Sequence, residues 1–177
     1  ASIPLILDRI IEQSQRASET LKQILNFARS GRLRCLIVHL DELVTDAISL
    51  IEFESHRHQV AIHIDLPSDL PPLHVDCIQI QQVLLNLIRN ACESLSGSDA
   101  SSRDVWIRAQ VGNSFVEIVV EDNGPGIPEE NLQKIFDPFF TTRPEGVGIG
   151  LAISKTIIEA HEGELRGENG PEGGARF

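Results

Sequence analysis

The chain has 177 residues, of which 41% are hydrophobic and 23% are charged, and its formal net charge is −11. This length and composition predict one globular domain with an appended segment, and they argue against a disordered chain. The acidic balance excludes nucleic acid as a partner recognised through a basic surface, because such binding depends on Lys and Arg replacing counterions.

No apolar run approaches the roughly 20 residues that cross a bilayer, so we expect no membrane segment in this chain. The three cysteines, Cys35, Cys77 and Cys92, follow no metal-ligand spacing. On the helix expected at 76–95, the latter two would lie about 22 Å apart, too far for a disulfide. A reducing, cytoplasmic location follows, and it is compatible with a longer parent protein anchored in a membrane.

Residues 3–28 are expected to form one long helix. Small and apolar residues step by alternating fours and threes, the spacing of a coiled-coil seam: Ile3, Leu7, Ile10, Ser14, Ala17, Leu21, Ile24 and Ala28. Gly31 ends the pattern. Two interpretations stay open, a helix that packs against a partner helix in a bundle and a helix that lies on the core of its own domain. We expect residues 1–34 to form a unit distinct from 35–177.

The remaining elements mix helices with antiparallel strands. Asp76 is placed to cap the clearest helix, and a Gly112-Asn113 turn favours a tight hairpin. The expected order is a strand at 35–38, a helix from Asp41, a strand at 59–66, a helix at 76–95, strands at 105–111 and 115–121, a short helix near 129–135, a helix to about His161 and two short strands. This pattern predicts an α+β fold, a two-layer sandwich with helices on one face of a sheet.

A polar stripe runs along the helix expected at 76–95. Gln82, Asn86, Asn90 and Glu93 step by four, four and three residues, so they share one face. The simplest explanation is a solvated helix face. The functional one is that carboxamide oxygens hold Mg²⁺, a hard cation, without adding charge, which suits an ion already carried by phosphates.

An acidic residue ends the second strand of the hairpin. Asp122 is followed by Asn123, Gly124, Pro125, Gly126 and Ile127. A buried carboxylate needs a partner, and the amino group of a purine is a suitable one. Glycines would let the backbone pass close to a flat base. An ordinary Asp-Asn-Gly turn is the structural alternative.

Glycines also occupy every second position from Gly146 to Gly150, directly before an apolar helix. Exposed N–H groups at a helix start form an anion site. The preceding stretch, 136–143, combines three aromatics with two hydroxyls and Arg143. It is expected either to form a small satellite core or to act as a movable lid, anchored by its aromatics, with Thr and Arg facing phosphates.

Together, four segments resemble the nucleotide-binding boxes of the sensor histidine kinases of two-component systems. They are QVLLNLIRNACESL at 82–95, DNGPGI at 122–127, FDPFFTT at 136–142 and GVGIGL at 146–151. The resemblance runs from about Leu40 to the end and is closest to the branch of nitrogen- and oxygen-responsive kinases. It implies the fold shared with gyrase-type ATPases, a mixed sheet covered by helices on one face.

The resemblance implies a site for ATP or ADP with Mg²⁺. Asp122 would read the adenine amino group, and Asn90 would ligate Mg²⁺ with Asn86 close by. Gly148 and Gly150 would cradle phosphates. The other implied nucleotide-binding positions are Gly124, Gly126, Ile127, Phe136, Phe139, Thr141, Thr142, Arg143, Gly146, Val147, Ile149 and Leu151.

The implied reaction is transfer of the γ-phosphoryl group to a protein histidine, with Asn86, Asn90 and Arg143 as the catalytic residues. ATP-hydrolysing members of the superfamily carry a water-activating Glu where this chain has Asn86, which cannot act as a general base. Two other functions stay open. One is a nucleotide-dependent interaction module, and the other, weakened by Asn86, is an ATPase.

The implied partners are a phosphoacceptor helix, in the same kinase or a dimer partner, and the receiver domain of a response regulator. Residues 1–34 contain no His and resemble only the second helix of the family's phosphotransfer hairpin. This fragment is therefore not expected to phosphorylate itself. The chain departs from the family pattern at Ala175, where a Thr usually supports the adenine-binding Asp, and at Glu93, where some branches carry a basic residue.

Overall fold

The computed structural model describes residues 33–96, 102–143, 146–171 and 173–177. The helix expected at 3–28 lies outside these ranges. In the described part of the chain, no helix is long and apolar enough to span a bilayer.

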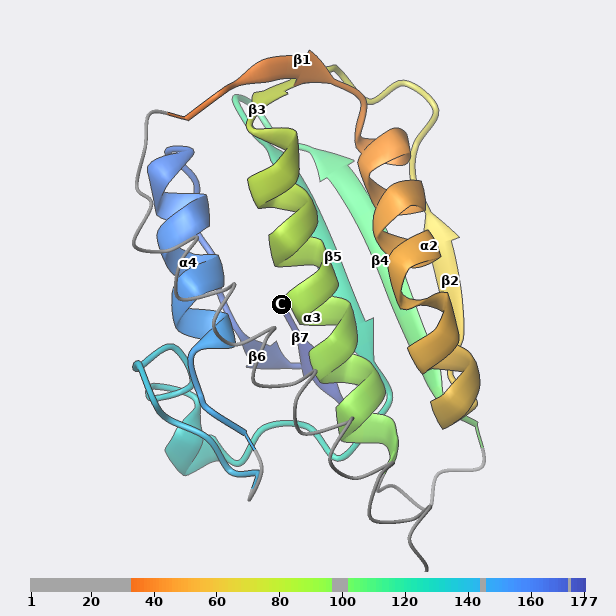
Figure 1. Cartoon of the computed structure of the whole chain (residues 1–177), viewed down its shortest axis with the longest axis vertical. Helices are drawn as coiled ribbons and strands as arrows, with labels where there is room; N and C mark the ends of the chain where they lie inside the picture. The colour runs from red at the N-terminus through yellow and green to blue at the C-terminus, as the bar shows by residue number, and fades with distance from the viewer. Residues whose placement is uncertain (1–32, 97–101, 144–145, 172) are drawn as a thin grey trace, which may run out of the picture.

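A five-stranded mixed sheet forms one layer of the domain (Figure 1). Its strand order is β2-β4-β5-β7-β6, with β2 parallel to β4 and the other neighbours antiparallel. The strands are β2 (Ala61–Asp65), β4 (Asp104–Val111), β5 (Val116–Asp122), β6 (Glu168–Asn169) and β7 (Ala175–Arg176). The short β7 pairs with the end of β5, so the last residues of the chain lie beside Asp122.

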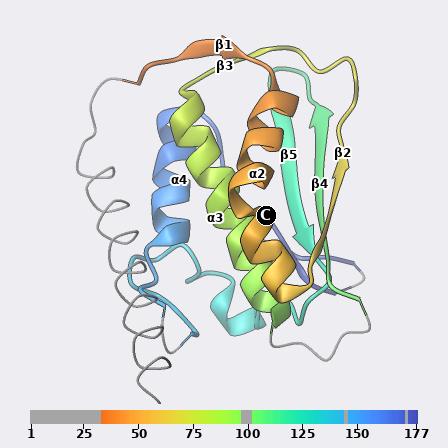
Figure 2. The ribbon, with the colours of Figure 1, turned by 45° about the vertical axis from the view of Figure 1, so that its right-hand side comes forward.

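Three helices form the second layer and cover one face of the sheet (Figure 2). They are α2 (Leu40–His58), α3 (Cys77–Ser96) and α4 (Gly150–Ala160). Helix α3 lies between the other two and packs on both. Its apolar stripe is buried against the sheet: Ile80, Val83, Leu84, Leu87, Ile88, Ala91, Cys92 and Leu95. The expected two-layer architecture is confirmed, and burial of α3 on one side leaves its polar stripe on the other.

The N-terminus of α3 is fixed by polar contacts from two directions. The Asp76 carboxylate accepts the N–H of Gln79 at 3.3 Å, as the expected cap, and also the N–H of Arg34 at 3.0 Å. The ring of His161, at the end of α4, accepts the N–H of Asp76 at 3.0 Å and donates to the Ile157 carbonyl at 2.7 Å. With both ring nitrogens engaged, His161 joins α4 to α3 as a structural residue.

Three details differ from the sequence-based expectation. Strand β1 (Leu36–Val38) pairs with β3 (Leu73–Val75). The sequence did not predict β3, because this strand has three residues and directly follows two prolines. The hairpin turn is shifted by one residue, since the N–H of Gly112 bonds the Phe115 carbonyl at 2.8 Å and encloses residues 113 and 114. The helix expected at 129–135 is a single 3₁₀ turn, η1 (Glu129–Asn131), followed by hydrogen-bonded turns in which the N–H groups of Lys134 and Ile135 both bond the Asn131 carbonyl.

Candidate nucleotide-binding site

Asp122, the last residue of β5, is only 3% exposed. Its Oδ1 atom accepts the N–H of Gly124 at 2.8 Å and that of Ala175 at 3.3 Å. Its other oxygen, Oδ2, accepts no hydrogen bond from a described residue. Among the described residues, every fully buried side-chain oxygen or nitrogen has a hydrogen-bond partner, so Oδ2 is not fully buried. Oδ2 therefore keeps contact with solvent and is free to accept a ligand's hydrogen bond. Burial raises the pKa of Asp122, and its two N–H donors partly oppose that rise.

The glycine segment after Asp122 is shaped by close contacts. A Cβ atom on Gly124 would lie 2.8 Å from Asp122 Oδ1 and 3.0 Å from the Ser94 hydroxyl of α3. Gly126 has φ = 75°, and a Cβ there would meet Asn169 Oδ1 at 2.7 Å. Gly124 accordingly brings its backbone close to α3, and Gly126 brings its backbone close to Asn169 of β6, with no side chain of their own in between.

Asn169 of β6 fixes the far end of that segment, and sequence reasoning missed it. Its Oδ1 accepts the N–H of Ile127 at 2.7 Å, and its Nδ2 donates to the Ile127 carbonyl at 2.8 Å. The two residues are 42 positions apart, and the surrounding Glu-Asn-Gly sequence indicates only a turn. No local signal could have identified this contact.

The chain closes on Asp122 through main-chain atoms. Ala175 lacks the hydroxyl expected at its place, and its N–H donates to the Asp122 carboxylate. Gly174 has φ = 79°, and a Cβ on it would lie 1.7 Å from the Asp122 carbonyl oxygen. Only glycine allows so close an approach in this conformation.

The two asparagines of α3 are in different situations. Asn86 Nδ2 donates to the Ser154 hydroxyl of α4 at 3.0 Å, and a Cβ on Gly150 would lie 2.4 Å from Asn86 Oδ1. The Asn90 side chain has no hydrogen bond to any described residue, although its backbone carbonyl accepts one from Arg143. Asn90 is therefore available to a ligand, whereas Asn86 joins α3 to α4. Ser154 is a second residue that sequence reasoning missed.

Arg143 crosses from the expected lid to α3. Its guanidinium forms an ion pair with Glu93, and Nη2 donates to the Asn90 carbonyl at 2.9 Å. Burial lowers the pKa of Arg143. The exposed Thr141 accepts the N–H of Arg143 at 3.1 Å, and Thr142 is also exposed. Arg143 thus bonds α3 in this structure, where the sequence predicted that it would face phosphates.

The lid and the second glycine segment are joined through their backbones. Phe139 N–H donates to the Gly148 carbonyl at 2.8 Å. Gly148 has φ = 70°, and a Cβ there would meet the Phe140 carbonyl oxygen at 2.5 Å. Ile149 is buried, whereas Gly146 and Val147 are exposed.

The aromatic residues of the lid do not all anchor it. Phe136 is partly buried, with the Lys155 ammonium 5.4 Å from its ring centre. Phe139 is 74% exposed and has φ = 69°. The expectation that Phe139 anchors the lid is therefore wrong, because its strained backbone turns the ring outward instead of into the core.

Three separate segments meet one helix. Gly124 contacts α3 at Ser94, Arg143 contacts it at Asn90 and Glu93, and α4 contacts it at Asn86. Asn86 and Ser94 are about 12 Å apart along α3, a distance on the scale of a nucleotide. The polar stripe is therefore lined by the Asp122 region at one end and by the α4 N-terminus at the other.

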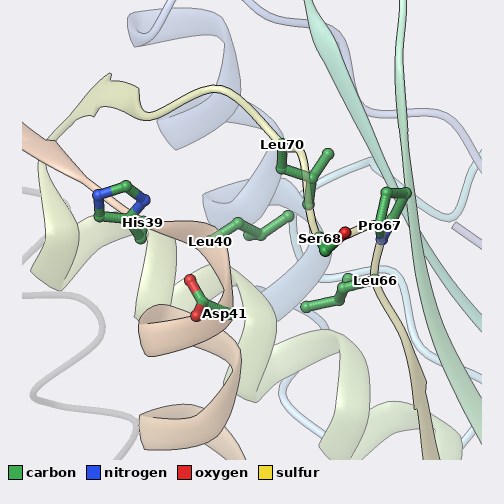
Figure 3. Close-up of a pocket in the computed structure, with 7 residues that line it drawn as sticks. All are labelled: His39, Leu40, Asp41, Leu66, Pro67, Ser68 and Leu70. Carbon is green, nitrogen blue, oxygen red and sulfur yellow. The ribbon is translucent and has the colours of Figure 1, made fainter.

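The two described cavities lie elsewhere. One, of about 270 Å³, lies between the start of α2 and the β2–β3 connection (Figure 3), and its lining is His39, Leu40, Asp41, Leu66, Pro67, Ser68 and Leu70. The other, of about 250 Å³, includes Arg108, Glu121 and Arg176 on the sheet face away from the helices. Neither contains a residue of the polar stripe, so cavity size does not identify the site.

The residues present fit a nucleotide and its magnesium ion. Asp122 Oδ2, which accepts no hydrogen bond from a described residue, suits an amino group, and the glycines leave room for a base. In the described ranges, no group of three or more His, Cys, Asp or Glu residues could hold a metal by itself. The free Asn90 amide suits an ion that phosphates have already neutralised, and the α4 N-terminus, which has no side-chain cap, presents N–H groups suited to phosphate.

Known proteins agree with this geometry. The family described as histidine kinase-, DNA gyrase B-, and HSP90-like ATPase matches residues 75–177. The sensor protein TdiS of Thauera aromatica is 33% identical over 179 residues, which cover 100% of this chain and 33% of TdiS. The chain therefore spans about a third of that relative's length.

Two solved structures are similar over nearly the whole chain. Full-length ShkA in complex with AMPPNP has a TM-score of 0.82 and 25% identity, covering 100% of this chain and 38% of that one. Histidine kinase ThkA in complex with the response regulator protein TrrA has a TM-score of 0.79 and 29% identity, covering 97% of this chain and 48% of that one. The chain belongs to the histidine kinase-, DNA gyrase B-, and HSP90-like ATPase family and is an ATP-binding catalytic domain of the sensor histidine kinase type.

Proposed function

We propose that this domain binds Mg²⁺-ATP across α3 and transfers its γ-phosphoryl group to a histidine on a separate phosphoacceptor helix, for relay to a response regulator. The bond from the γ-phosphorus to the β–γ bridging oxygen breaks, a phosphorus–nitrogen bond to the imidazole forms, and ADP leaves. The receiver aspartate then takes the phosphoryl group. We place this reaction in the cytoplasm, where ATP is available and the three described cysteines stay reduced.

One observation carries the proposal: Asp122 Oδ2 and the Asn90 amide, neither of which bonds a described residue, flank the same stretch of α3. Asp122 would accept the adenine amino group, while Gly124, Gly126 and Ile127 pass beside the base. Asn90 would contact Mg²⁺, which when bound neutralises charge on the phosphates. The α4 N-terminus, from Gly148 through Leu151, would bind the phosphates through its N–H groups.

Asn86 favours transfer to a protein nucleophile over hydrolysis. A carboxamide cannot take a proton from water, and the Asn86 amide is bonded to Ser154. Its proposed role is to hold the α4 N-terminus against α3 beside Asn90. Positioning and charge neutralisation then supply most of the catalysis.

The remaining site assignments are part of the same proposal. Phe136 would support the lid from its partly buried position, and Phe139, Thr141, Thr142, Gly146 and Val147 would approach the phosphates as the lid closes. Residues 1–34 would belong to a phosphotransfer hairpin and 35–177 to the catalytic domain. The response regulator is proposed as a partner because ThkA was crystallised with TrrA.

The test adds a separately made helix hairpin that carries the acceptor histidine. With this domain, ATP and Mg²⁺, we expect acid-labile, base-stable phosphate on the hairpin. A hairpin with that histidine replaced by Gln serves as the control. If no phosphate transfers under conditions where ATP binds, the domain acts instead as a nucleotide-dependent interaction module.

A further inference from the structure

Glu93 and Arg143 form an ion pair between two segments that the proposed function brings to the phosphates. The side chains of Arg143 and Glu93 are 38% and 41% exposed, so solvent and ligands can reach both. A second bond, from Arg143 Nη2 to the Asn90 carbonyl at 2.9 Å, holds the same guanidinium on α3. Arg143 is thus held next to the residue proposed to contact Mg²⁺.

Glu93 accepts a hydrogen bond from the Arg143 guanidinium that a phosphate could accept in its place. Carboxylates and phosphates both accept paired hydrogen bonds from a guanidinium, so they compete for it. Partly exposed ion pairs contribute little net free energy, because solvent screens them. A doubly charged phosphate group within reach of Arg143 can therefore replace the Glu93 carboxylate.

The backbone of the lid allows this exchange. Phe139 N–H is bonded to the Gly148 carbonyl, which joins the lid to the second glycine segment, and within the lid the Thr141 hydroxyl accepts the N–H of Arg143. The guanidinium itself is held by Glu93 and by the Asn90 carbonyl. A change of its partner leaves the Phe139–Gly148 bond in place but removes one of the contacts that hold the lid on α3.

We propose that Glu93 is a specificity-determining residue that makes binding sensitive to the γ-phosphate. In the free domain it retains Arg143 on α3. A nucleoside triphosphate takes Arg143 from Glu93, whereas a diphosphate leaves the pair in place. The inference rests on the proposed function, since it requires the phosphates to lie beside Asn90.

The ion pair between Glu93 and Arg143 affects the binding of ATP but not the binding of ADP. ATP gains a contact with Arg143, but the loss of the Glu93 contact offsets part of that gain. ADP gains no contact with Arg143, and its binding leaves the contact between Arg143 and Glu93 intact. Removing the Glu93 charge should consequently increase the affinity for ATP more than the affinity for ADP.

The experiment measures the Kd of ATP and ADP, with and without Mg²⁺, by calorimetry for the wild type and Glu93→Gln. We expect Glu93→Gln to bind Mg²⁺-ATP up to about fivefold more tightly, or about 1 kcal/mol, and ADP within about twofold of the wild type. Glu54→Gln is the matched control. It also removes a carboxylate paired with an arginine of α3, Arg89, but on the side that faces α2. Both affinities should stay at the wild-type values in that control.

Amide hydrogen exchange supplies a readout without nucleotide. Glu93→Gln should speed exchange of the Phe139 N–H, because the lid loses one of its bonds to α3. Glu54→Gln should leave that rate unchanged. A Phe139 exchange rate that is the same in all three proteins would show that Glu93 does not retain the lid, and would overturn the proposal.

Three affinity results would also overturn it. Unchanged or weaker ATP binding by Glu93→Gln would mean that Arg143 does not leave Glu93. An equal gain for ATP and ADP would indicate a general charge effect, and a loss seen only with Mg²⁺ would make Glu93 a metal ligand. Asp122→Asn, measured in parallel, separates the hypotheses. If it weakens ATP binding while Glu93→Gln has no selective effect, only the role of Glu93 is wrong, whereas unchanged ATP binding by Asp122→Asn would contradict the nucleotide site itself.

Discussion

The two ends of the site are built differently. At the Asp122 end, main-chain N–H groups and tightly packed glycines fix a buried carboxylate, and Asn169 holds the neighbouring loop. At the Arg143 end, a partly exposed ion pair ties the lid to α3, and the threonines of the lid are exposed. The first end is fixed mainly by backbone geometry, and the second mainly by charge.

This difference assigns separate tasks to the two ends. A base is flat and uncharged, so a rigid surface with one fixed acceptor can recognise it without rearrangement. The phosphate chain changes its charge during the reaction, so the groups that bind it must exchange partners. If the site is divided in this way, substitutions at the Asp122 end should mainly change stability and base recognition, and substitutions at the Arg143 end should mainly change phosphate binding.

The largest expected effect comes from adding a methyl group at the rigid end. Gly174→Ala should destabilise the fold by about 3 kcal/mol or more, because positive-φ strain is joined by a clash with the Asp122 carbonyl. Gly173→Ala is the matched control. It has φ = 97° but nothing within 4 Å of the new Cβ, so it should lose only about 1–2 kcal/mol through strain. Urea denaturation measures both, and equal losses would show that close packing at Gly174 is unimportant.

A smaller effect distinguishes the two asparagines. Asn90→Ala should weaken Mg²⁺-ATP binding by about tenfold while leaving stability within about 0.5 kcal/mol, since its side chain has no partner among the described residues. Asn86→Ala should lose about 1 kcal/mol of stability with its bond to Ser154. Calorimetry with and without Mg²⁺, together with urea denaturation, checks both. A stability loss confined to Asn90→Ala would reverse these assignments.

The smallest effect is a pH dependence carried by Asp122. Burial raises the pKa of this acid in the folded domain, so its protonated form favours folding. That contribution is fully present below the unfolded pKa and is lost as the pH rises through the folded pKa. ATP affinity should change in the opposite direction, falling as the pH falls through the folded pKa. The free energy of unfolding and the ATP affinity are measured against pH for the wild type and for Asp122→Asn, and the difference between the two proteins isolates this carboxyl group. Identical pH profiles of both quantities would exclude its role.

Sequence patterns predicted the parts of the fold that are long and periodic. The apolar stripe of α3 extends over many residues, and β4 and β5 are apolar runs on either side of a recognisable turn, so local sequence was sufficient. Strand β3 was missed because three residues after two prolines carry no usable period. The Asp122 segment was proposed as a binding site because an acidic residue at the end of an apolar strand needs a partner when buried, although an ordinary Asp-Asn-Gly turn has the same local sequence.

The sequence could not predict contacts between distant side chains. Asn169 and Ser154 bond residues that are 42 and 68 positions away, and neither belongs to a local motif. The pairing of Arg143 with Glu93 spans 50 residues. Phe139 was misjudged because aromatic character indicates burial, whereas its positive φ, which no sequence pattern indicated, directs the ring outward.

The most direct test of the nucleotide site asks whether Asp122 recognises the amino group of adenine. The measurement is the ratio of the Kd values of inosine triphosphate and ATP, because inosine carries an oxygen in place of that amino group. The wild type should favour ATP by about a hundredfold or more, and Asp122→Asn, whose amide can donate to the oxygen, should reduce that preference by at least about tenfold. Asp69→Asn, at an exposed loop position, is the control and should keep the wild-type ratio. An unchanged ratio in Asp122→Asn would contradict the account.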